Sequence, residues 1–127
     1  MARVKLDGRN ALQIQARNER TRASWRSQAY LERGWYRFEG MARTDSLTSG
    51  SVRLRISGDT QSIGFGGTSN WRLLSHDFEV TDAGIDVEFV CELNAYQGGV
   101  WFDVDSLRVK KISTTEARPL NRRTILQ

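Results

Sequence analysis

The side chains of this sequence that could do chemistry are concentrated in residues 67–111, and most of them are aromatic or acidic. Trp71 follows a glycine-rich stretch, and Trp101 and Asp103 follow two further glycines. An indole ring can stack on the apolar face of another ring. Nothing nearby resembles an activated nucleophile or a catalytic base. This segment therefore favours a site that holds a ligand over a site that transforms one.

Aromatic side chains are the first candidate ligand contacts. Trp35 is out of phase with the apolar residues that follow it, so it points to the outer face or the edge of its strand. Tyr96 lies in a loop between two strongly patterned strands, where binding residues commonly gather. Trp71 can stack on a sugar ring or plug the end of a sheet, and Trp35 can contact a ligand or pack at a sheet edge. Both interpretations of each tryptophan stay open.

Charged side chains that alternate with apolar ones form the second part of the candidate site. Arginine and carboxylate groups together offer the donors and acceptors that sugar hydroxyl groups need. If the segments that carry them are neighbours, they form a polar face that either binds a ligand or is a solvated surface with cross-strand ion pairs. The residues concerned are Arg37, Glu39, Arg43, Arg53, Arg55, Glu88 and Glu92.

Catalytic and zinc chemistry are not indicated. His76 is the sole histidine and alternates with Leu74 and Phe78, so we expect it to be buried and structural. It has no second histidine for a zinc site, and no Ser-His-Asp arrangement is evident. Asp103 and Asp105 could in principle act as paired glycosidase carboxylates, but a bulge or bend is expected near Asp105. We therefore predict that the chain is not an enzyme.

The elements that must position these residues are strands, because alternation of apolar and polar residues dominates and no segment keeps a helical period. Turn signals recur about every 8–12 residues, which is typical of antiparallel sandwiches. The prediction is an all-β, antiparallel β-sandwich of jelly-roll type with about eight to nine strands. The expected strands cover residues 4–6, 11–16, 25–31, 35–43, 52–56, 71–80, 85–93 and 100–112. Loops are expected at residues 17–23, 44–50 and 58–69.

The length and net charge of the chain limit how many domains it can form and which partners it can bind. The 127 residues fit one domain, and we divide them into a sandwich at 1–112 and a C-terminal tail or linker at 113–127. The net charge is +4, with seven Lys and Arg against two acids in residues 1–26 and nine against twelve in residues 27–112. A nucleic-acid module would more often carry positive charge on its folded face. We therefore predict no nucleic-acid partner.

Cysteine content and hydropathy add two further expectations. Cys91 is alone and in phase with Val87 and Phe89, which predicts a buried thiol without an internal disulfide. No apolar run approaches the ~20 residues of a membrane span. No signal peptide is evident, because Arg3 and Lys5 interrupt the first apolar residues. The chain is thus either intracellular or a domain of a longer secreted protein.

Three motifs, in order, resemble those of carbohydrate-binding modules of the CenC type, and the likeness covers residues 4–112. Residues 33–44, Arg-Gly-Trp-Tyr-Arg-Phe-Glu-Gly-Met-Ala-Arg-Thr, resemble its "G-x-Y-x-F-x-G-x-x-R-T" strand. Residues 67–80 resemble its "G-T-x-x-W…F-x-V" segment. Residues 99–107, Gly-Val-Trp-Phe-Asp-Val-Asp-Ser-Leu, resemble its closing "W-F-D-D-V-S-L" strand.

The resemblance implies a galactose-binding-like jelly roll that binds an oligo- or polysaccharide without catalysis. It also implies an extracellular or cell-envelope location, within a larger secreted protein whose other domains would be partners. In many relatives the aspartate that matches Asp103 helps to bind a structural calcium ion, for which Asp7 is a second candidate ligand. The usual Asp-Asp-Val becomes Asp-Val-Asp at 103–105, and calcium needs about six to eight oxygen ligands.

The predicted ligand contacts combine the aromatic and charged candidates, with no catalytic residue among them. They are Trp35, Tyr96, Trp71, Arg37, Glu39, Arg43, Arg53 and Glu88. The alternative function is a structural or protein-interaction sandwich in a larger envelope or tail assembly. In that case the outward aromatic side chains would anchor an interface.

Overall fold

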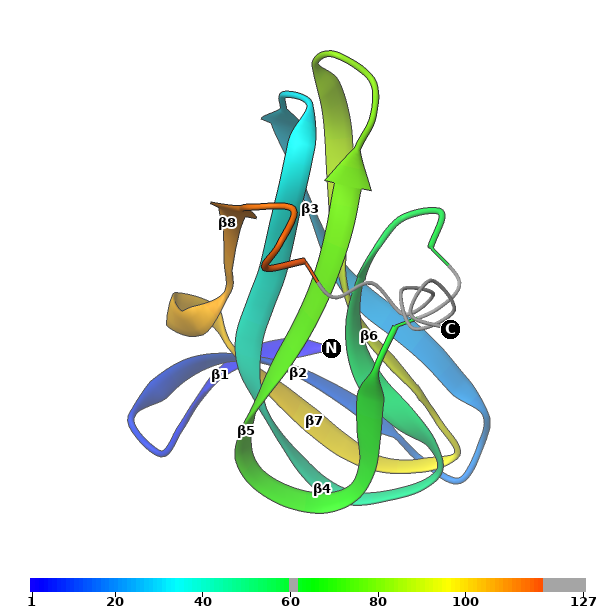
Figure 1. The fold of residues 1–127 in the computed structure, drawn as a ribbon. Coiled ribbons are helices and arrows are strands. Elements are labelled where there is room, and N and C mark those ends of the chain that lie inside the picture. The colour runs from blue at the N-terminus through cyan, green and yellow to red at the C-terminus, as the bar shows by residue number, and fades with distance from the viewer. Residues whose placement is uncertain (60–61, 118–127) are drawn as a thin grey trace.

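The computed structural model describes residues 1–59 and 62–117, which form eight antiparallel strands and one 3-10 helix (Figure 1). The strands alternate apolar and polar residues, and this explains why they pair into sheets that are buried on one side. The elements are β1 (Ala2–Leu6), β2 (Arg9–Ala16), β3 (Thr21–Leu31), β4 (Gly34–Ile56), β5 (Gly64–Val80), β6 (Ile85–Ala95), β7 (Gln97–Asp103), η1 (Val104–Ser106) and β8 (Arg108–Ile112).

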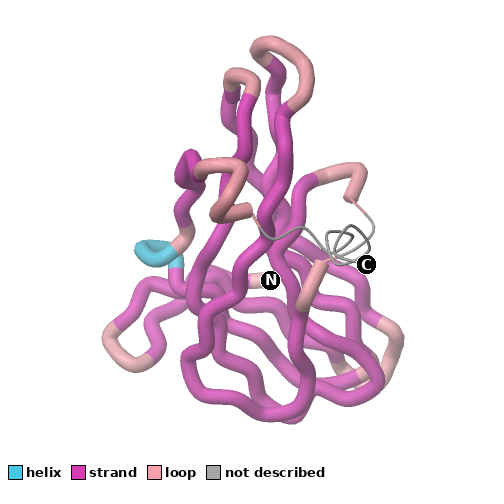
Figure 2. Tube along the Cα trace, viewed as in Figure 1, coloured by secondary structure: helices cyan, strands magenta, loops and turns pink. Residues whose placement is uncertain are grey.

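The strands form two layers because β4 and β5 are long enough to belong to both. In the first layer, β1, β2 and β7 lead to the N-terminal half of β4, which also pairs with β8 and with β5. In the second layer, β3 pairs with β6, and β6 pairs with residues 51–56 of β4. Figures 1 and 2 show β4 and β5 curving together from one layer to the other. The predicted antiparallel β-sandwich is confirmed.

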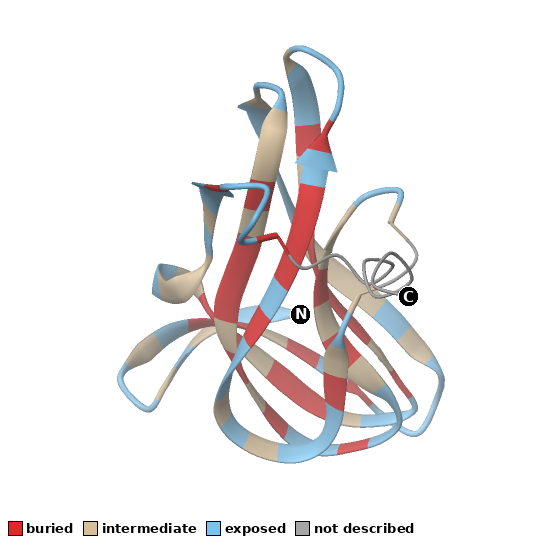
Figure 3. Ribbon diagram, in the orientation of Figure 1, coloured by how far each residue is buried: buried red, intermediate tan, exposed pale blue. Residues whose placement is uncertain are grey.

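The core lies between the layers and is built by every second residue of the strands. Phe38 packs edge-on against Phe89 at 5.1 Å between ring centroids, and Tyr36 stacks on Phe78 at 5.7 Å. Phe102 is completely buried. Figure 3 shows buried and exposed residues alternating along the strands. Each strand therefore has one face for the core and one face that can meet a ligand.

Two boundary predictions are wrong. The expected loop at 44–50 is part of the continuous strand β4, whose register against β5 shifts at three places between Ala42 and Val52. The expected loop at 58–69 ends early, because β5 begins at Gly64. The bulge or bend predicted near Asp105 is the turn of η1, which separates β7 from β8. Residues 44–50 and 64–69 are rich in serine, threonine and glycine. They therefore lack the alternation of apolar and polar residues by which the other strands were predicted.

The predicted tail at 113–127 lies outside the described residues from position 118 onward. Residues 113–117 pack onto the first layer, where Ala117 is buried and Arg37 Nη2 donates a hydrogen bond to the Glu116 carbonyl oxygen at 3.1 Å. The division at residue 112 stays a prediction. In the described part of the chain, no helix is long and apolar enough to cross a membrane.

Candidate binding face

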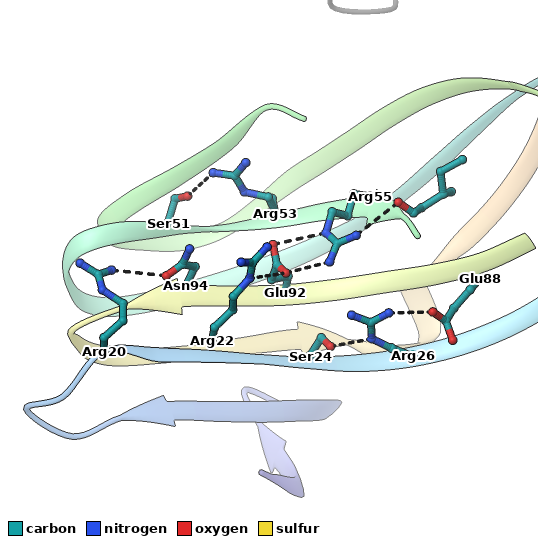
Figure 4. A network of polar contacts seen from close by, with 11 residues as sticks. Arg20, Arg22, Ser24, Arg26, Ser51, Arg53, Arg55, Glu88, Glu92 and Asn94 are labelled. Atoms are coloured by element: carbon teal, nitrogen blue, oxygen red, sulfur yellow. Dashed lines mark hydrogen bonds and ion pairs between the residues drawn. The ribbon is translucent and has the colours of Figure 1, made fainter. Parts of the chain in front are cut away.

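The outer face of the second layer gathers polar side chains from three neighbouring strands, and we call it the arginine face (Figure 4). Its members point away from the core because successive residues of a strand alternate between faces. Pairing of β3 and β4 with opposite edges of β6 then brings the side chains of the three strands side by side. The arginine face comprises Arg20, Arg22, Ser24, Arg26, Ser51, Arg53, Arg55, Glu88, Glu92 and Asn94.

Glu92 occupies the centre of the arginine face. Its carboxylate accepts hydrogen bonds from Arg55 Nη2 at 3.0 Å and Nε at 3.4 Å, and Arg22 Nε lies 3.6 Å away. Burial alone would raise the pKa of Glu92, but the hydrogen bond and charge of Arg55, with the charge of Arg22, outweigh it and lower the pKa. Glu92 is therefore a carboxylate at neutral pH and already holds a guanidinium group.

Arg53 lies opposite Glu92 in the register between β4 and β6. Its Nη2 donates a hydrogen bond to Ser51 Oγ at 2.8 Å. Its Nε is buried and has no hydrogen-bond partner within the described residues. A buried donor without an acceptor costs about 1–3 kcal/mol. A ligand could supply the acceptor only after the Arg53 side chain reorients, because Nε is not exposed.

The two ends of the arginine face differ in charge. At one end Arg26 Nη1 donates to Glu88 Oε1 at 2.7 Å. At the other end Arg20 Nη1 donates to the Ser49 carbonyl oxygen at 2.6 Å and to Asn94 Oδ1 at 3.4 Å, with no carboxylate partner among the described residues. The first end is thus neutralised internally, whereas the second carries excess positive charge.

Tyr96 follows Asn94 closely in the chain and lies in the turn between β6 and β7, with 46% of its surface exposed. Its backbone N–H donates to the Thr48 carbonyl oxygen at 3.0 Å, and its carbonyl oxygen accepts from the Glu19 N–H at 3.2 Å. The backbone of Tyr96 is thereby fixed close to Asn94 in the chain, and its side chain is exposed.

A depression of about 320 Å³ crosses the arginine face. Its size lies at the lower limit of small-ligand sites, which span about 300–1,000 Å³. The Asp59 carboxylate at its margin lies 2.7 Å from Nε2 of His76, which is buried as predicted. The depression is lined by Arg22, Arg53, Arg55, Gly58, Asp59, Glu92 and Asn94.

The predicted charged residues are divided between two faces instead of sharing one. Arg53, Arg55, Glu88 and Glu92 lie on the arginine face. Arg37, Glu39 and Arg43 point outward from the half of β4 that belongs to the first layer, as does Trp35. This separation follows from the length of β4, because its two halves belong to different layers.

Charged groups on the outer face of the first layer are largely paired with one another. Arg37 donates to Asp77 at 2.7 Å and 3.0 Å, and this hydrogen bonding raises the pKa of Arg37. Burial alone would raise the pKa of Glu39, but the hydrogen bond from Arg108 and the charge of Lys110 outweigh it and lower the pKa. These are cross-strand ion pairs, but the carboxylates of Glu39 and Asp77 are buried and not solvated.

A second depression, of about 430 Å³, lies on the outer face of the first layer. It combines the paired charges of Arg37 and Glu39 with two exposed apolar side chains, Ile63 and Leu73. Trp35 is half-buried on the same face, where it opposes Ile112 of β8. The predicted residues Trp35, Arg37 and Glu39 therefore lie near one another but away from Arg53 and Glu88.

Trp71 is held by the β1–β2 hairpin. Its Nε1 donates to Asp7 Oδ2 at 2.9 Å, and Arg43 binds the same carboxylate oxygen. The guanidinium carbon of Arg9 lies 4.8 Å from the centroid of the Trp71 ring. The hydrogen bond from Trp71 is the main cause of the lowered pKa of Asp7, and Arg43 adds to it. These contacts match the interpretation of Trp71 as a plug at the sheet end.

The surroundings of Asp103 do not fit a calcium ion in this arrangement. Asp103 Oδ2 accepts a hydrogen bond from Arg9 Nη1 at 2.6 Å, and Oδ1 accepts one from the Asp105 N–H at 3.2 Å. A guanidinium group at this distance repels a cation. Within residues 1–59 and 62–117, no group of three or more His, Cys, Asp or Glu side chains could hold a metal ion. Calcium at Asp103 and Asp7 stays a prediction from the resemblance.

Sequence reasoning missed six members of the arginine face: Arg20, Arg22, Ser24, Arg26, Ser51 and Asn94. The predicted loop at 17–23 ends too late, because β3 already begins at Thr21. Arginines that were counted with a basic N-terminal segment therefore belong to the folded face. The alternation of Arg22, Ser24 and Arg26 with Ala23 and Trp25 is the signal that could have revealed them.

A solved structure with a similar fold supports the β-sandwich assignment. No protein-family model and no curated protein matches the sequence. Among solved structures, the chain is similar to the carbohydrate-binding module TmCBM61, which is described in complex with β-1,4-galactotriose. The TM-score is 0.58 at 12% sequence identity, and the match covers 81% of this chain and 71% of that chain. The fold of this protein is thus shared with a carbohydrate-binding module.

Proposed function

We propose that this protein is a non-catalytic carbohydrate-binding module that binds an oligo- or polysaccharide on the arginine face. The observation that carries the proposal is the depression of about 320 Å³ in that face, which guanidinium, carboxylate and amide groups line together. Its walls come from three strands of a fold that is shared with a carbohydrate-binding module. Ligand sites commonly combine such a hollow with a few convergent polar groups.

The polar groups of the depression match the hydrogen-bonding needs of a sugar. Each sugar hydroxyl both donates and accepts hydrogen bonds. Arg22 and Arg53 offer N–H donors, and the Asn94 amide offers a donor and an acceptor. Tyr96 at the end of the face provides a ring on which a sugar can stack. Together these groups could hold one or a few sugar units across β3, β6 and β4.

Binding without chemistry is consistent with the state of Glu92. A general acid needs a raised pKa so that it carries a proton at the working pH. The pKa of Glu92 is lowered, chiefly because the favourable effect of Arg55 exceeds the penalty of burial. Glu92 is therefore suited to positioning Arg55 and a ligand, not to protonating a glycosidic oxygen.

Finer parts of the proposal rest on the sequence resemblance. We assign the module to the CenC type, and we place it outside the cell or in the cell envelope as part of a larger secreted protein. Of the predicted contacts, Arg53, Glu88 and Tyr96 belong to or adjoin the arginine face. Trp35 and Trp71 belong to the other layer and would form a separate contact surface.

Calorimetric titration with a panel of neutral and acidic polysaccharides tests the proposal. The variants Arg22→Gln and Tyr96→Ala should each weaken binding by roughly tenfold, because each removes a direct contact. Trp35→Ala, on the first layer, is the matched comparison and should leave binding unchanged. Loss of binding in Trp35→Ala alone would move the site to the first layer. Absence of binding to every glycan of the panel would refute the function.

A protein-interaction role is the second candidate function. It is favoured by the exposed side chains of Ile63 and Leu73, which are 67% and 54% exposed beside the second depression. Exposed apolar residues that line a hollow can anchor a partner. Light scattering should then show an assembly that Leu73→Glu abolishes. A monomer at all concentrations, with no capture of neighbouring domains, would argue against this role.

A further inference from the structure

We propose that the ligand of the arginine face is an acidic glycan, whose sugar carboxylates bind Arg22 and Arg53. This inference rests on the proposed function and deepens it by naming the class of glycan. It is carried by the excess of guanidinium groups over carboxylates at the Asn94 end of the face. Charge complementarity of this kind selects among partners more than it sets raw affinity.

The charge excess is visible residue by residue. Arg20, Arg22 and Arg53 surround the Asn94 end, where Glu92 is the nearby carboxylate (Figure 4). Arg55 already binds Glu92 through two nitrogens. The depression is thus lined by two carboxylates, of Glu92 and Asp59, and by three guanidinium groups, of Arg22, Arg53 and Arg55, which repel one another. A bound carboxylate would relieve their mutual repulsion, which a neutral sugar would leave in place.

Glu19 precedes Arg20, and its N–H donates to the Tyr96 carbonyl oxygen at 3.2 Å, so one acid lies at the Asn94 end. Three other acids have partners of their own or lie farther away. Glu88 is paired with Arg26, and Asp59 lies against His76. Asp86 opposes Tyr30 at the opposite end of β3 and β6. The excess of guanidinium groups is therefore found around Arg22 and Arg53 beside Asn94, and the ligand's carboxylates should lie there.

Two arginines are placed to receive a carboxylate. Arg22 contacts Glu92 through Nε at 3.6 Å, and 69% of its side chain is exposed, so its terminal nitrogens face solvent. Arg53 holds Ser51 with Nη2 and its Nε is buried, so its side chain has to reorient before both nitrogens can meet a carboxylate. A planar guanidinium binds a planar carboxylate with two parallel hydrogen bonds. Both side chains line the same depression.

Polygalacturonate and its carboxyl-reduced derivative form a matched pair of probes. The two polymers share linkage and ring stereochemistry and differ in charge. The full protein, titrated by calorimetry, should bind polygalacturonate at least roughly tenfold more tightly, as expected for charge-assisted hydrogen bonds. The difference should shrink as salt is added, because salt screens exposed charges beyond about 8 Å at physiological ionic strength.

Arg22→Gln and Arg53→Gln test the residues themselves. Each should reduce the affinity for polygalacturonate by roughly tenfold and the affinity for the reduced polymer by less, so that the preference for the charged polymer shrinks. Arg33→Gln, an exposed arginine in the β3–β4 turn, is the control and should change neither affinity. Thermal melts show which variants remain folded. If Arg53→Gln unfolds because Arg53 is the more buried residue, Arg22→Gln alone still tests the inference.

The possible outcomes separate this inference from the proposed function. Equal binding of both polymers, or equal affinity of Arg22→Gln and the unaltered protein for polygalacturonate, would overturn the acidic-glycan inference and leave glycan binding intact. Failure to bind any glycan would overturn both. Binding of a sulfated polysaccharide or single-stranded DNA as tightly as polygalacturonate would also overturn it, in favour of general polyanion binding.

Discussion

Replacing Glu92 with glutamine should destabilise the fold more than the same change at Glu88 on the same strand. Glu92 and its partner Arg55 expose 6% and 12% of their side chains, whereas Glu88 and Arg26 expose 30% and 42%. Two opposite charges about 4 Å apart attract by about 4 kcal/mol near a protein surface. Desolvation opposes roughly half of this, so we expect Glu92→Gln to cost about 2 kcal/mol. Glu88→Gln should cost about 0.5 kcal/mol, as exposed pairs do.

Thermal and urea unfolding at neutral pH measure both changes. For a chain of 127 residues, the Glu92→Gln loss corresponds to a fall in the unfolding midpoint of about 5–10 °C. Glu88→Gln is the control for the chemistry of the substitution, because strand, face and residue type are the same. If both variants lose the same free energy of unfolding, burial is not the reason that the Glu92–Arg55 pair stabilises the fold, and the argument is refuted.

The same pair predicts a pH dependence. The pKa of Glu92 is lower in the folded chain, since the stabilising effects of Arg55 and Arg22 exceed the burial penalty. Its charge therefore contributes stability above the unfolded pKa of about 4.3, and this contribution is lost as the pH falls through the folded pKa. The unaltered protein should lose stability more steeply in this acid range than Glu92→Gln. Parallel curves would contradict the assignment.

Three further predictions concern buried or paired groups. Burial raises the pKa of Cys91 to about 12, so its thiol should resist alkylation at mildly alkaline pH and react after unfolding in urea. Trp71→Phe should raise the pKa of Asp7 toward its usual value, because the indole hydrogen bond is the main cause of its lowering; carboxyl NMR titration would show no change if that is wrong. Because Arg9 holds Asp103, calcium added after chelation should leave the unfolding midpoint unchanged, and a rise would support the calcium prediction.

Local alternation was enough to predict the faces of the strands. In residues 35–43, Tyr36 and Phe38 are buried while Arg37 is on the opposite face, as the pattern indicated. Cys91 and His76 are buried for the same reason. A strand exposes successive side chains to opposite sides, so its pattern can be recognised without knowing its neighbours. The sandwich class follows from several such strands in one chain.

Strand order, by contrast, was decided by pairing between distant parts of the chain. Arg22 and Glu92 are far apart in sequence and meet because β3 and β6 are neighbours. Arg37 and Arg53 lie on the same strand but on different layers, because β4 curves between them. Alternation says which side chains point outward, and only the tertiary structure determines which outward side chains share a surface. The arginine face is therefore a product of long-range strand pairing.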